Sequence, residues 1–118
     1  MSVLTKTIRE FVNEEKLAFI AAVCPDGTPN LSPNGTVRAW DDNHLVFADI
    51  HSPNTIENLL YNSAIEINVV DIFTRKGFRF KGHADVLSEG ELFKSILTYY
   101  KQGGTQQHIA SDILYSLK

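Results

Sequence analysis

Cysteine, long hydrophobic runs and basic charge are all scarce in this chain of 118 residues. The single cysteine, Cys24, rules out an internal disulfide and is typical of a reducing compartment. The longest hydrophobic run, residues 17–24, is far shorter than the about 20 residues that span a bilayer. No secretory signal is recognisable at the N-terminus. The net charge of −3 argues against a nucleic-acid-binding module, which is usually basic. We therefore expect a cytoplasmic protein that binds neither membranes nor nucleic acids.

Common catalytic and metal-binding motifs are missing as well. The sequence has no phosphate-binding loop of the Walker type, no dinucleotide glycine fingerprint and no nucleophile elbow. The four histidines, His44, His51, His83 and His108, do not have the short spacing of metal ligands. We predict no metal site, and the sequence identifies no catalytic residue.

Hydrophobic periodicity and turn residues predict a mainly β protein with helices at its margins. An amphipathic helix is expected over residues 4–15, and another over 53–61. A capping box, with Ser88 as N-cap and Glu91 three residues on, predicts a third helix that stops at Gly103. Strands are expected at residues 17–24, 30–40, 44–50, 65–70, 78–87 and 112–117. Residues 1–118 would thus form one domain, a small antiparallel barrel whose last strand is cut off near Lys118.

The segment 45–60 carries the strongest functional signal, because a buried strand runs directly into a capped helix. Ser52 suits the N-cap and Pro53 suits the first helical position, where a missing N–H costs nothing. The free N–H groups that follow, together with the side chains of Asn54 and Thr55, would attract an anion such as phosphate. The alternative is an ordinary capped helix that binds only water.

Two other segments offer polar groups. Ser32-Pro33-Asn34-Gly35 interrupts the second strand, so it is expected at a sheet edge or bulge. Together with Thr36 it forms a polar break, whose freed backbone groups could bind the polar edge of a planar ring. The alternative there is a plain barrel corner. Residues 75–81 hold four basic side chains, which could bind a phosphate or simply face solvent.

Residues 17–24 are apolar on both faces of the predicted strand. One face of such a strand can fill the barrel interior, whereas the other needs a helix or a second subunit to cover it. We therefore expect a dimer.

The ordered set of these motifs resembles the pyridoxamine 5′-phosphate oxidase-like proteins, the FMN-binding split barrels. The resemblance covers residues 17–85. Its motifs are Leu17-Ala18-Phe19-Ile20-Ala21, Cys24-Pro25-Asp26-Gly27-Thr28-Pro29-Asn30-Leu31-Ser32-Pro33, Asp41-Asp42, Leu45-Val46-Phe47-Ala48-Asp49-Ile50, Ser52-Pro53-Asn54-Thr55, Asn58-Leu59 and Phe78-Arg79-Phe80-Lys81-Gly82.

The resemblance implies a six-stranded antiparallel split barrel that forms a homodimer, with FMN in a cleft between the subunits. The strand-to-helix turn would hold the phosphate through Ser52, Asn54 and Thr55. The flavin ring would lie against the strand before that turn and near the broken strand. The matching residues there are Ala48, Asp49, Ile50, Ser32, Pro33 and Asn34.

The function that follows is that of a flavin-dependent oxidoreductase of unknown substrate, in which the cofactor carries the redox chemistry. A flavin carrier or electron-transfer module without a substrate of its own is the alternative. Relatives that bind haem or the deazaflavin F420 leave a different cofactor open, and a barrel that has lost its cofactor is a third possibility.

Overall fold

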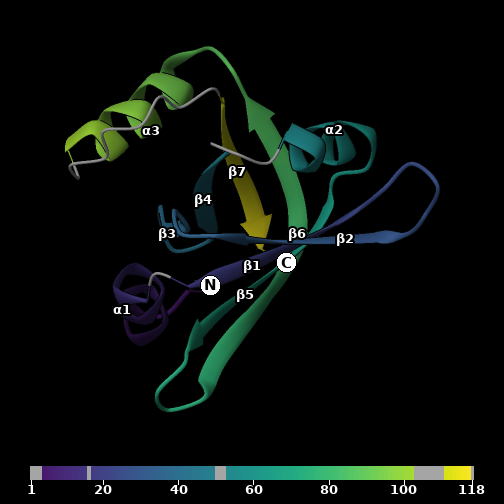
Figure 1. Ribbon diagram of the computed structural model, residues 1–118. Coiled ribbons are helices and arrows are strands. Elements are labelled where there is room, and N and C mark those ends of the chain that lie inside the picture. Colours follow the sequence, from purple (N-terminus) through teal and green to yellow (C-terminus); the bar gives the residue numbers. More distant parts are fainter. Residues whose placement is uncertain (1–3, 16, 50–52, 103–110, 118) are drawn as a thin grey trace.

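The computed structural model describes residues 4–15, 17–49, 53–102 and 111–117, which form one antiparallel sheet curled into a barrel (Figure 1). The strand order is β2-β1-β5-β6-β7-β4-β3. Six longer strands and the two-residue β3 make up the sheet, so the mainly β architecture is confirmed. The elements are α1 (Lys6–Glu14), β1 (Ala18–Val23), β2 (Pro29–Asn34), β3 (Arg38–Ala39), β4 (His44–Asp49), α2 (Pro53–Tyr61), β5 (Ala64–Asp71), β6 (Lys76–Leu87), α3 (Glu91–Gln102) and β7 (Ser111–Leu117).

The barrel core is built from alternate residues of its strands, because successive side chains of a strand point to opposite faces. On β1, Ala18, Ile20 and Ala22 are buried, whereas Phe19 and Ala21 are only half-buried on the other side. The same alternation on the other strands completes the core, whose members include Leu45, Phe47, Ile65, Ile67, Val69, Phe80 and Ala84. Residues 17–24 therefore do present two apolar faces, as their sequence predicts.

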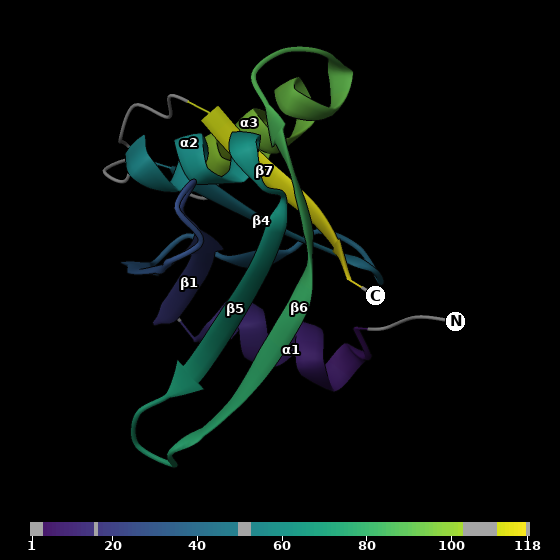
Figure 2. The same cartoon turned by 90° about the vertical axis from the view of Figure 1, so that its right-hand side faces the viewer.

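Helix α1 lies at the opposite end of the sheet from α2 and α3 (Figures 1 and 2). Thr5 caps it by accepting a hydrogen bond from the Ile8 N–H, so the helix starts two residues later than its hydrophobic pattern alone predicts. Leu4 and Val12 are fully buried in the barrel core. None of the described helices is long and apolar enough to cross a membrane.

Strand β2 is an edge of the sheet, and this explains how it accommodates Pro33. Its one ladder is to β1, where Pro33 pairs with Phe19. A proline has no N–H to donate and is tolerated at an edge. The expected return strand over residues 30–40 is in fact two strands, because β2 ends at Asn34 and β3 begins at Arg38.

Strand β7 lies between β6 and β4 and pairs with both along its length (Figure 2). The last strand of the chain is thus an interior strand of the sheet. Helix α3 precedes it and packs Ile96 and Tyr100 against Val46 and Ala48, on the side of β4 that faces away from the core.

The predicted capping box at the start of α3 is wrong. The helix begins at Glu91, and the Gly90 carbonyl accepts its first hydrogen bond, from the Lys94 N–H at 3.1 Å. Gly90 has a φ of 98°, a left-handed conformation that glycine adopts without steric cost. The chain therefore turns into the helix at Gly90 rather than at Ser88.

Candidate functional site

The barrel is closed by side chains where β2 approaches β4, two strands that form no ladder with each other. The Asn34 Nδ2 donates to the Ala48 carbonyl oxygen at 3.1 Å. The Thr36 hydroxyl accepts from the Ala48 N–H at 2.9 Å and lies 2.6 Å from Asn34 Oδ1, to which it donates. The Thr36 N–H also donates to Asn34 Oδ1, at 2.7 Å. These contacts satisfy both backbone polar groups of Ala48, which β4 would otherwise leave open on this side.

A second contact joins β2 to the first turn of α2. The hydroxyl oxygens of Ser32 and Thr55 lie 3.4 Å apart, at the limit of a hydrogen bond. Thr55 is only 3% exposed although its side chain is polar. One turn further along α2, the buried Asn58 directs its Nδ2 at the Cys24 sulfur, at 3.7 Å. We call Ser32, Asn34, Thr36, Ala48 and Thr55 together the polar seam.

Helix α3 supports the polar seam from behind. The Tyr100 hydroxyl donates to the Thr36 carbonyl oxygen at 2.7 Å, and Tyr100 is 3% exposed. Tyr100 also packs edge-on against Tyr99, which in turn packs against Trp40. The backbone of Thr36 is therefore held from one side by Tyr100 and from the other by Asn34.

The predicted site residues fall into three groups. Four of them, Ser32, Asn34, Ala48 and Thr55, are brought together in the polar seam. Pro33 is not, because it is exposed on the opposite face of β2 and pairs with Phe19. The backbones of Asp49 and Asn54 lie in β4 and α2 as expected, and their side chains are not described, whereas Ile50 and Ser52 lie outside the described residues.

The sequence placed Thr36 in the polar break but did not identify it as a site residue, and it gave no indication of Tyr100. A threonine just after Pro33-Asn34-Gly35 is typical of a turn, so nothing local indicates which groups its hydroxyl contacts. Tyr100 gave only the signal of an apolar helix face, because nothing in its neighbourhood reveals a partner 64 residues earlier in the chain.

The chemistry of the polar seam is neutral, since it consists of hydroxyl, amide and backbone groups. Such groups can donate to an anion or to the polar edge of a ring without supplying charge. The nearest basic side chain along the chain, Arg38, donates to the carbonyls of Gly35 and Val37. The described part of the chain holds no cluster of three or more potential metal ligands.

The basic segment 75–81 lies elsewhere. Arg79 and Lys81 are exposed on the outward face of β6, with Arg79 Nη1 3.9 Å from Glu66 Oε1. Their strand neighbours are β5 and β7, whereas the polar seam joins β2 to β4. Within one subunit, these basic side chains therefore lie on strands other than the two that the polar seam joins.

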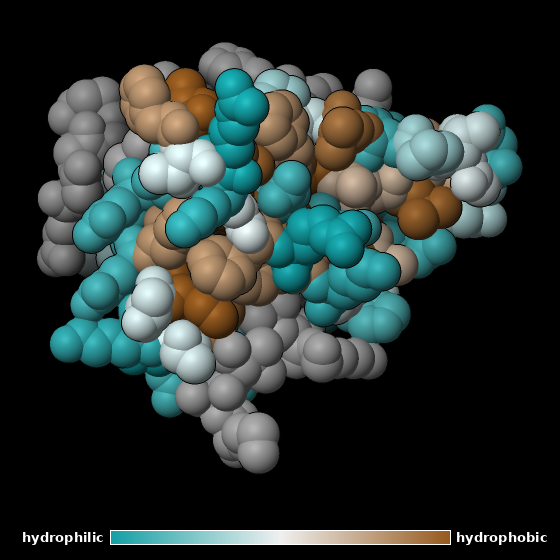
Figure 3. Space-filling view, turned by 90° about the horizontal axis from the view of Figure 1, so that it is seen from below, coloured by the Kyte–Doolittle hydropathy of each residue, from teal (hydrophilic) through white to brown (hydrophobic). Residues whose placement is uncertain are grey.

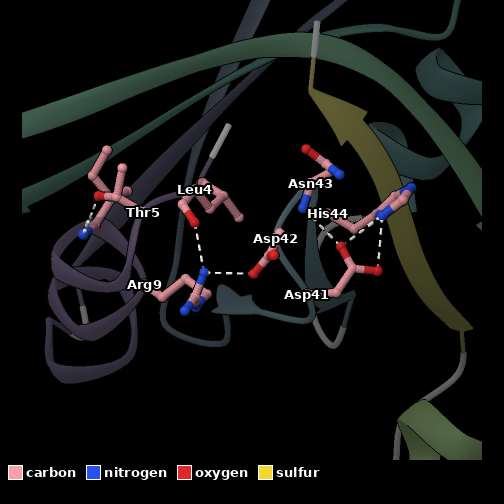
Figure 4. A network of polar contacts seen from close by, with 8 residues as sticks. Leu4, Thr5, Arg9, Asp41, Asp42, Asn43 and His44 are labelled. Atoms are coloured by element: carbon pink, nitrogen blue, oxygen red, sulfur yellow. Dashed lines mark hydrogen bonds and ion pairs between the residues drawn. The ribbon is translucent and has the colours of Figure 1, made fainter. Parts of the chain in front are cut away.

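Charged contacts instead fix the turn between β3 and β4 (Figure 4). Arg9 Nη1 lies 2.6 Å from Asp42 Oδ1 and also donates to the Leu4 carbonyl, which ties α1 to this turn. Asp41 accepts from the Asn43 N–H and lies 2.8 Å from His44 Nδ1. Burial raises the pKa of Asp41, but the hydrogen bonds from Asn43 and His44 outweigh it and hold that pKa below the ordinary value of 3.8.

We expect this turn to lose stability in acid. A carboxyl group whose pKa is lowered by folding stabilises the protein above its ordinary pKa, and this stabilisation is lost as the pH falls through the lower, folded value. For Asp41 the loss falls below about pH 4. Urea unfolding between pH 6 and pH 2 should show an Asp41→Asn variant with a shallower acid decline than wild type. The Asp85→Asn variant controls for net charge, and identical profiles for Asp41→Asn and wild type would contradict the assignment.

Fold and site together define an antiparallel split barrel whose closing edge is lined by neutral hydrogen-bonding groups. Residues 4–112 match the family model described as pyridoxamine 5′-phosphate oxidase, and the chain belongs to that family. No curated protein matches it significantly.

Three solved structures illustrate the shared fold. HupZ of Group A Streptococcus is 25% identical, with a TM-score of 0.86, over 98% of this chain and 90% of its own. HutZ of Vibrio cholerae, described as a haem storage protein, is 22% identical, with a TM-score of 0.73, over 98% and 90%. An FMN-binding protein of Syntrophomonas wolfei is 14% identical, with a TM-score of 0.72, over 93% and 79%. The latter two support the fold alone.

Proposed function

We propose that this protein is an FMN-binding flavoprotein that acts as a homodimeric, flavin-dependent oxidoreductase on a small-molecule substrate. The observation that carries the proposal is the polar seam itself. In a chain of this family, it brings Ser32 and Thr55 together at the start of α2 and brings Asn34 beside Ala48.

The residues of the polar seam fit the two ends of such a cofactor. A phosphate needs several donors, and the hydroxyls of Ser32 and Thr55, the side chain of Asn54 and the free N–H groups of the first turn of α2 would supply them. The buried position of Thr55 favours a strong interaction, because a hydrogen bond to an anion gains strength where water is excluded. The backbone of Ala48 and Asp49 and the β2 edge near Pro33 would border the ring.

The protein's part in the reaction is then to position the cofactor and to shield it from water. FMN, when bound, supplies the hydride or electron transfer. The hydrogen bonds of Asn34 and Thr36 fix the spacing between β2 and β4, and the hydrogen bond from Tyr100 keeps the Thr36 backbone from moving away from α3. These contacts would keep the binding edge preformed, so that binding does not have to order it.

The surface next to this edge supports the proposed homodimer. The outward-facing residues of β2, β1, β5 and β6 form what we call the outer face. Leu31 is 67% exposed there, beside the half-buried Phe19 and Ala21. Hydrophobic surface of this kind commonly marks an interface between chains. A second copy covering the outer face would also border the β2 edge, and would place the cofactor between subunits.

Haem is the main competing cofactor, since HutZ is described as a haem storage protein. Haem iron is usually held by histidine, cysteine, methionine or tyrosine. Among the histidine, cysteine, methionine and tyrosine side chains that the structure describes, Tyr100 contacts the polar seam, and its hydroxyl donates to Thr36. Of the described histidines, His44 lies against Asp41 and His83 against Ser63. The hydroxyl and amide groups of the polar seam suit the phosphate and the polar ring edge of a flavin. The absorption spectrum of protein reconstituted with each cofactor separates flavin bands from a Soret band.

The double variant Asn54→Ala/Thr55→Val should weaken FMN binding by about 1–3 kcal/mol, or roughly 5- to 150-fold in Kd. Valine keeps the shape of Thr55 while removing its hydroxyl, so the packing of α2 is retained. Titration of the purified protein with FMN, followed by flavin fluorescence, measures the effect.

The matched control is Thr98→Val, which removes a hydroxyl that donates only to the Lys94 carbonyl of its own helix. This control should bind FMN as wild type does. Equal affinities for wild type and the double variant would show that the start of α2 does not bind the phosphate. A wild type that binds no FMN at all would overturn the proposed function.

The activity itself is tested on the reduced holoprotein. An oxidoreductase should be reoxidised by some organic acceptor faster than by oxygen. Reoxidation by oxygen alone, across a panel of quinones, nitro compounds and imines, would leave a flavin carrier or electron-transfer module as the function.

A further inference from the structure

The hairpin between β5 and β6 ends in an unusually apolar tip. Phe73 is 91% exposed and Ile72 is 60% exposed, and they are followed by Thr74 and Arg75. We call these four residues the hairpin tip. Figure 3, which views the molecule from this side, shows hydrophobic and hydrophilic groups next to each other on its surface.

The hairpin tip is held in one conformation by Asp71. Its Oδ1 accepts from the Phe73 N–H at 3.0 Å, its Oδ2 accepts from the Thr74 hydroxyl at 2.9 Å, and its carbonyl accepts from the Arg75 N–H at 2.8 Å. These hydrogen bonds to the carboxylate lower the pKa of Asp71. A turn organised in this way presents Phe73 to solvent at little further cost in entropy when a partner binds it.

The outer face carries a hollow at the other end of the same hairpin. It has a volume of about 480 Å³, and its walls include Val23, Pro29, Ala64, Glu66 and His83. A second hollow, of about 320 Å³, lies beside it between Phe19, Leu31 and Asn68. Both are mainly apolar, which suits an aromatic side chain.

Glu66 lies in the wall of both hollows, and one of its carboxylate oxygens has no hydrogen-bond partner. Its Oε1 is buried and accepts no hydrogen bond, and the nearest cation, Arg79, is 3.9 Å away. A carboxylate oxygen in this state costs free energy unless a donor reaches it. An arginine from outside the subunit would supply that donor.

A two-fold axis would bring the tip and the hollow together twice. Ala64 and Glu66 precede Val69 on β5, at about 10–17 Å for a rise of about 3.3 Å per residue. Beyond Asp71 the chain reverses, because Asp71 pairs with Lys76 and the Arg75 N–H donates to the Asp71 carbonyl, so the hairpin tip lies roughly 10 Å past Val69. In an isologous dimer, each residue i that meets j is matched by j meeting i. With the axis near Val69, the hairpin tip of one subunit therefore reaches the level of Glu66 of the other, at the wall that both hollows share.

We propose that a second copy of this chain docks on the outer face by an exchange of hairpin tips. Phe73 of each subunit fills the larger hollow of its partner, and Arg75 of each subunit pairs with Glu66 across the interface. This proposal rests on the homodimer proposed above and identifies the residues that hold it together.

The test is a charge exchange followed by analytical ultracentrifugation of the full chain over a dilution series. Arg75→Glu and Glu66→Arg should each raise the dimer Kd about tenfold or more, and the double variant should recover most of that loss. Phe73→Ser should also weaken the dimer. Lys94→Glu, which reverses an exposed charge on α3, should not change it. Circular dichroism and thermal melts confirm that each variant folds.

The outcomes separate this proposal from the one on which it rests. A wild-type dimer that Arg75→Glu, Glu66→Arg and Phe73→Ser all leave intact would overturn the tip exchange and keep the homodimer. A monomeric wild type would contradict both the tip exchange and the homodimer. FMN titration would still test the cofactor site. Binding of wild type, but not of Phe73→Ser, to vesicles of phosphatidylserine and phosphatidylcholine, with no effect of the variants on assembly, would identify an anionic lipid surface as the occupant instead.

Discussion

Replacing Asn34 by alanine should lower the free energy of unfolding by about 2–3 kcal/mol. The substitution removes the donor to the Ala48 carbonyl and the acceptor of two hydrogen bonds from Thr36, at the point where β2 and β4 close the barrel. The Thr36 hydroxyl can turn to the Ala48 carbonyl, 3.1 Å away, but the Thr36 N–H is left without its partner. Chemical unfolding in urea measures the loss.

The matched control is Asn30→Ala, which makes the same substitution on the same strand at a position that pairs with Ala22. It should cost much less than Asn34→Ala. The Asn34→Ala variant should also bind FMN more weakly, because an edge that is no longer fixed must be ordered when the cofactor binds. Equal stability of the two variants would mean that the polar seam does not close the barrel.

Leu45→Ala should destabilise the protein by about 2–5 kcal/mol, the largest effect of any substitution considered. Leu45 is fully buried at the start of β4, in the cluster with Phe47 and Ile67. Removing its side chain takes hydrophobic surface out of the core and leaves a cavity that the surrounding strands can only partly fill. Because a domain of this size is stable by only about 5–15 kcal/mol, thermal unfolding should shift by many degrees.

Leu60→Ala provides the comparison, because the chemical change is identical and the burial is not. Leu60 is 69% exposed on α2, and a surface substitution of this kind usually stays within about 0.5 kcal/mol. Thermal and urea unfolding of the two variants, measured side by side, should differ several-fold in effect. A Leu45→Ala variant as stable as Leu60→Ala would mean that β4 is not part of a close-packed core.

Local sequence signals predicted the elements well where the chemistry is local. Pro53 starts α2 as expected, and Pro33 lies on an edge strand because it has no N–H to donate. The alternating pattern of residues 65–70 became β5. The capping box at Ser88 failed for a similar local reason, since Gly90 can adopt a left-handed conformation and offers the chain a later start for α3.

The candidate site was predicted only in part. Ser32 and Asn34 could be predicted because they lie at a strand break, and Thr55 because it lies at a strand-to-helix turn. Ala48 came only from the resemblance to the family. The mutual arrangement of these residues could not be predicted, and neither could the hydrogen bond that Tyr100 donates to Thr36. A hydrogen bond between residues so far apart in the chain leaves no trace in the sequence near either of them.

The sequence by itself determined the kinds of elements, the two apolar faces of β1 and the membership of this chain in a family of split barrels, because periodicity, turn residues and ordered motifs are local properties. Only the tertiary structure decided that β7 lies between β6 and β4, that β2 closes on β4 through Asn34 and Thr36, and that Glu66 has an oxygen without a donor. Those features depend on which distant segments share a surface. Which distant segments come into contact depends on the packing of the whole core, and no short stretch of the chain specifies it.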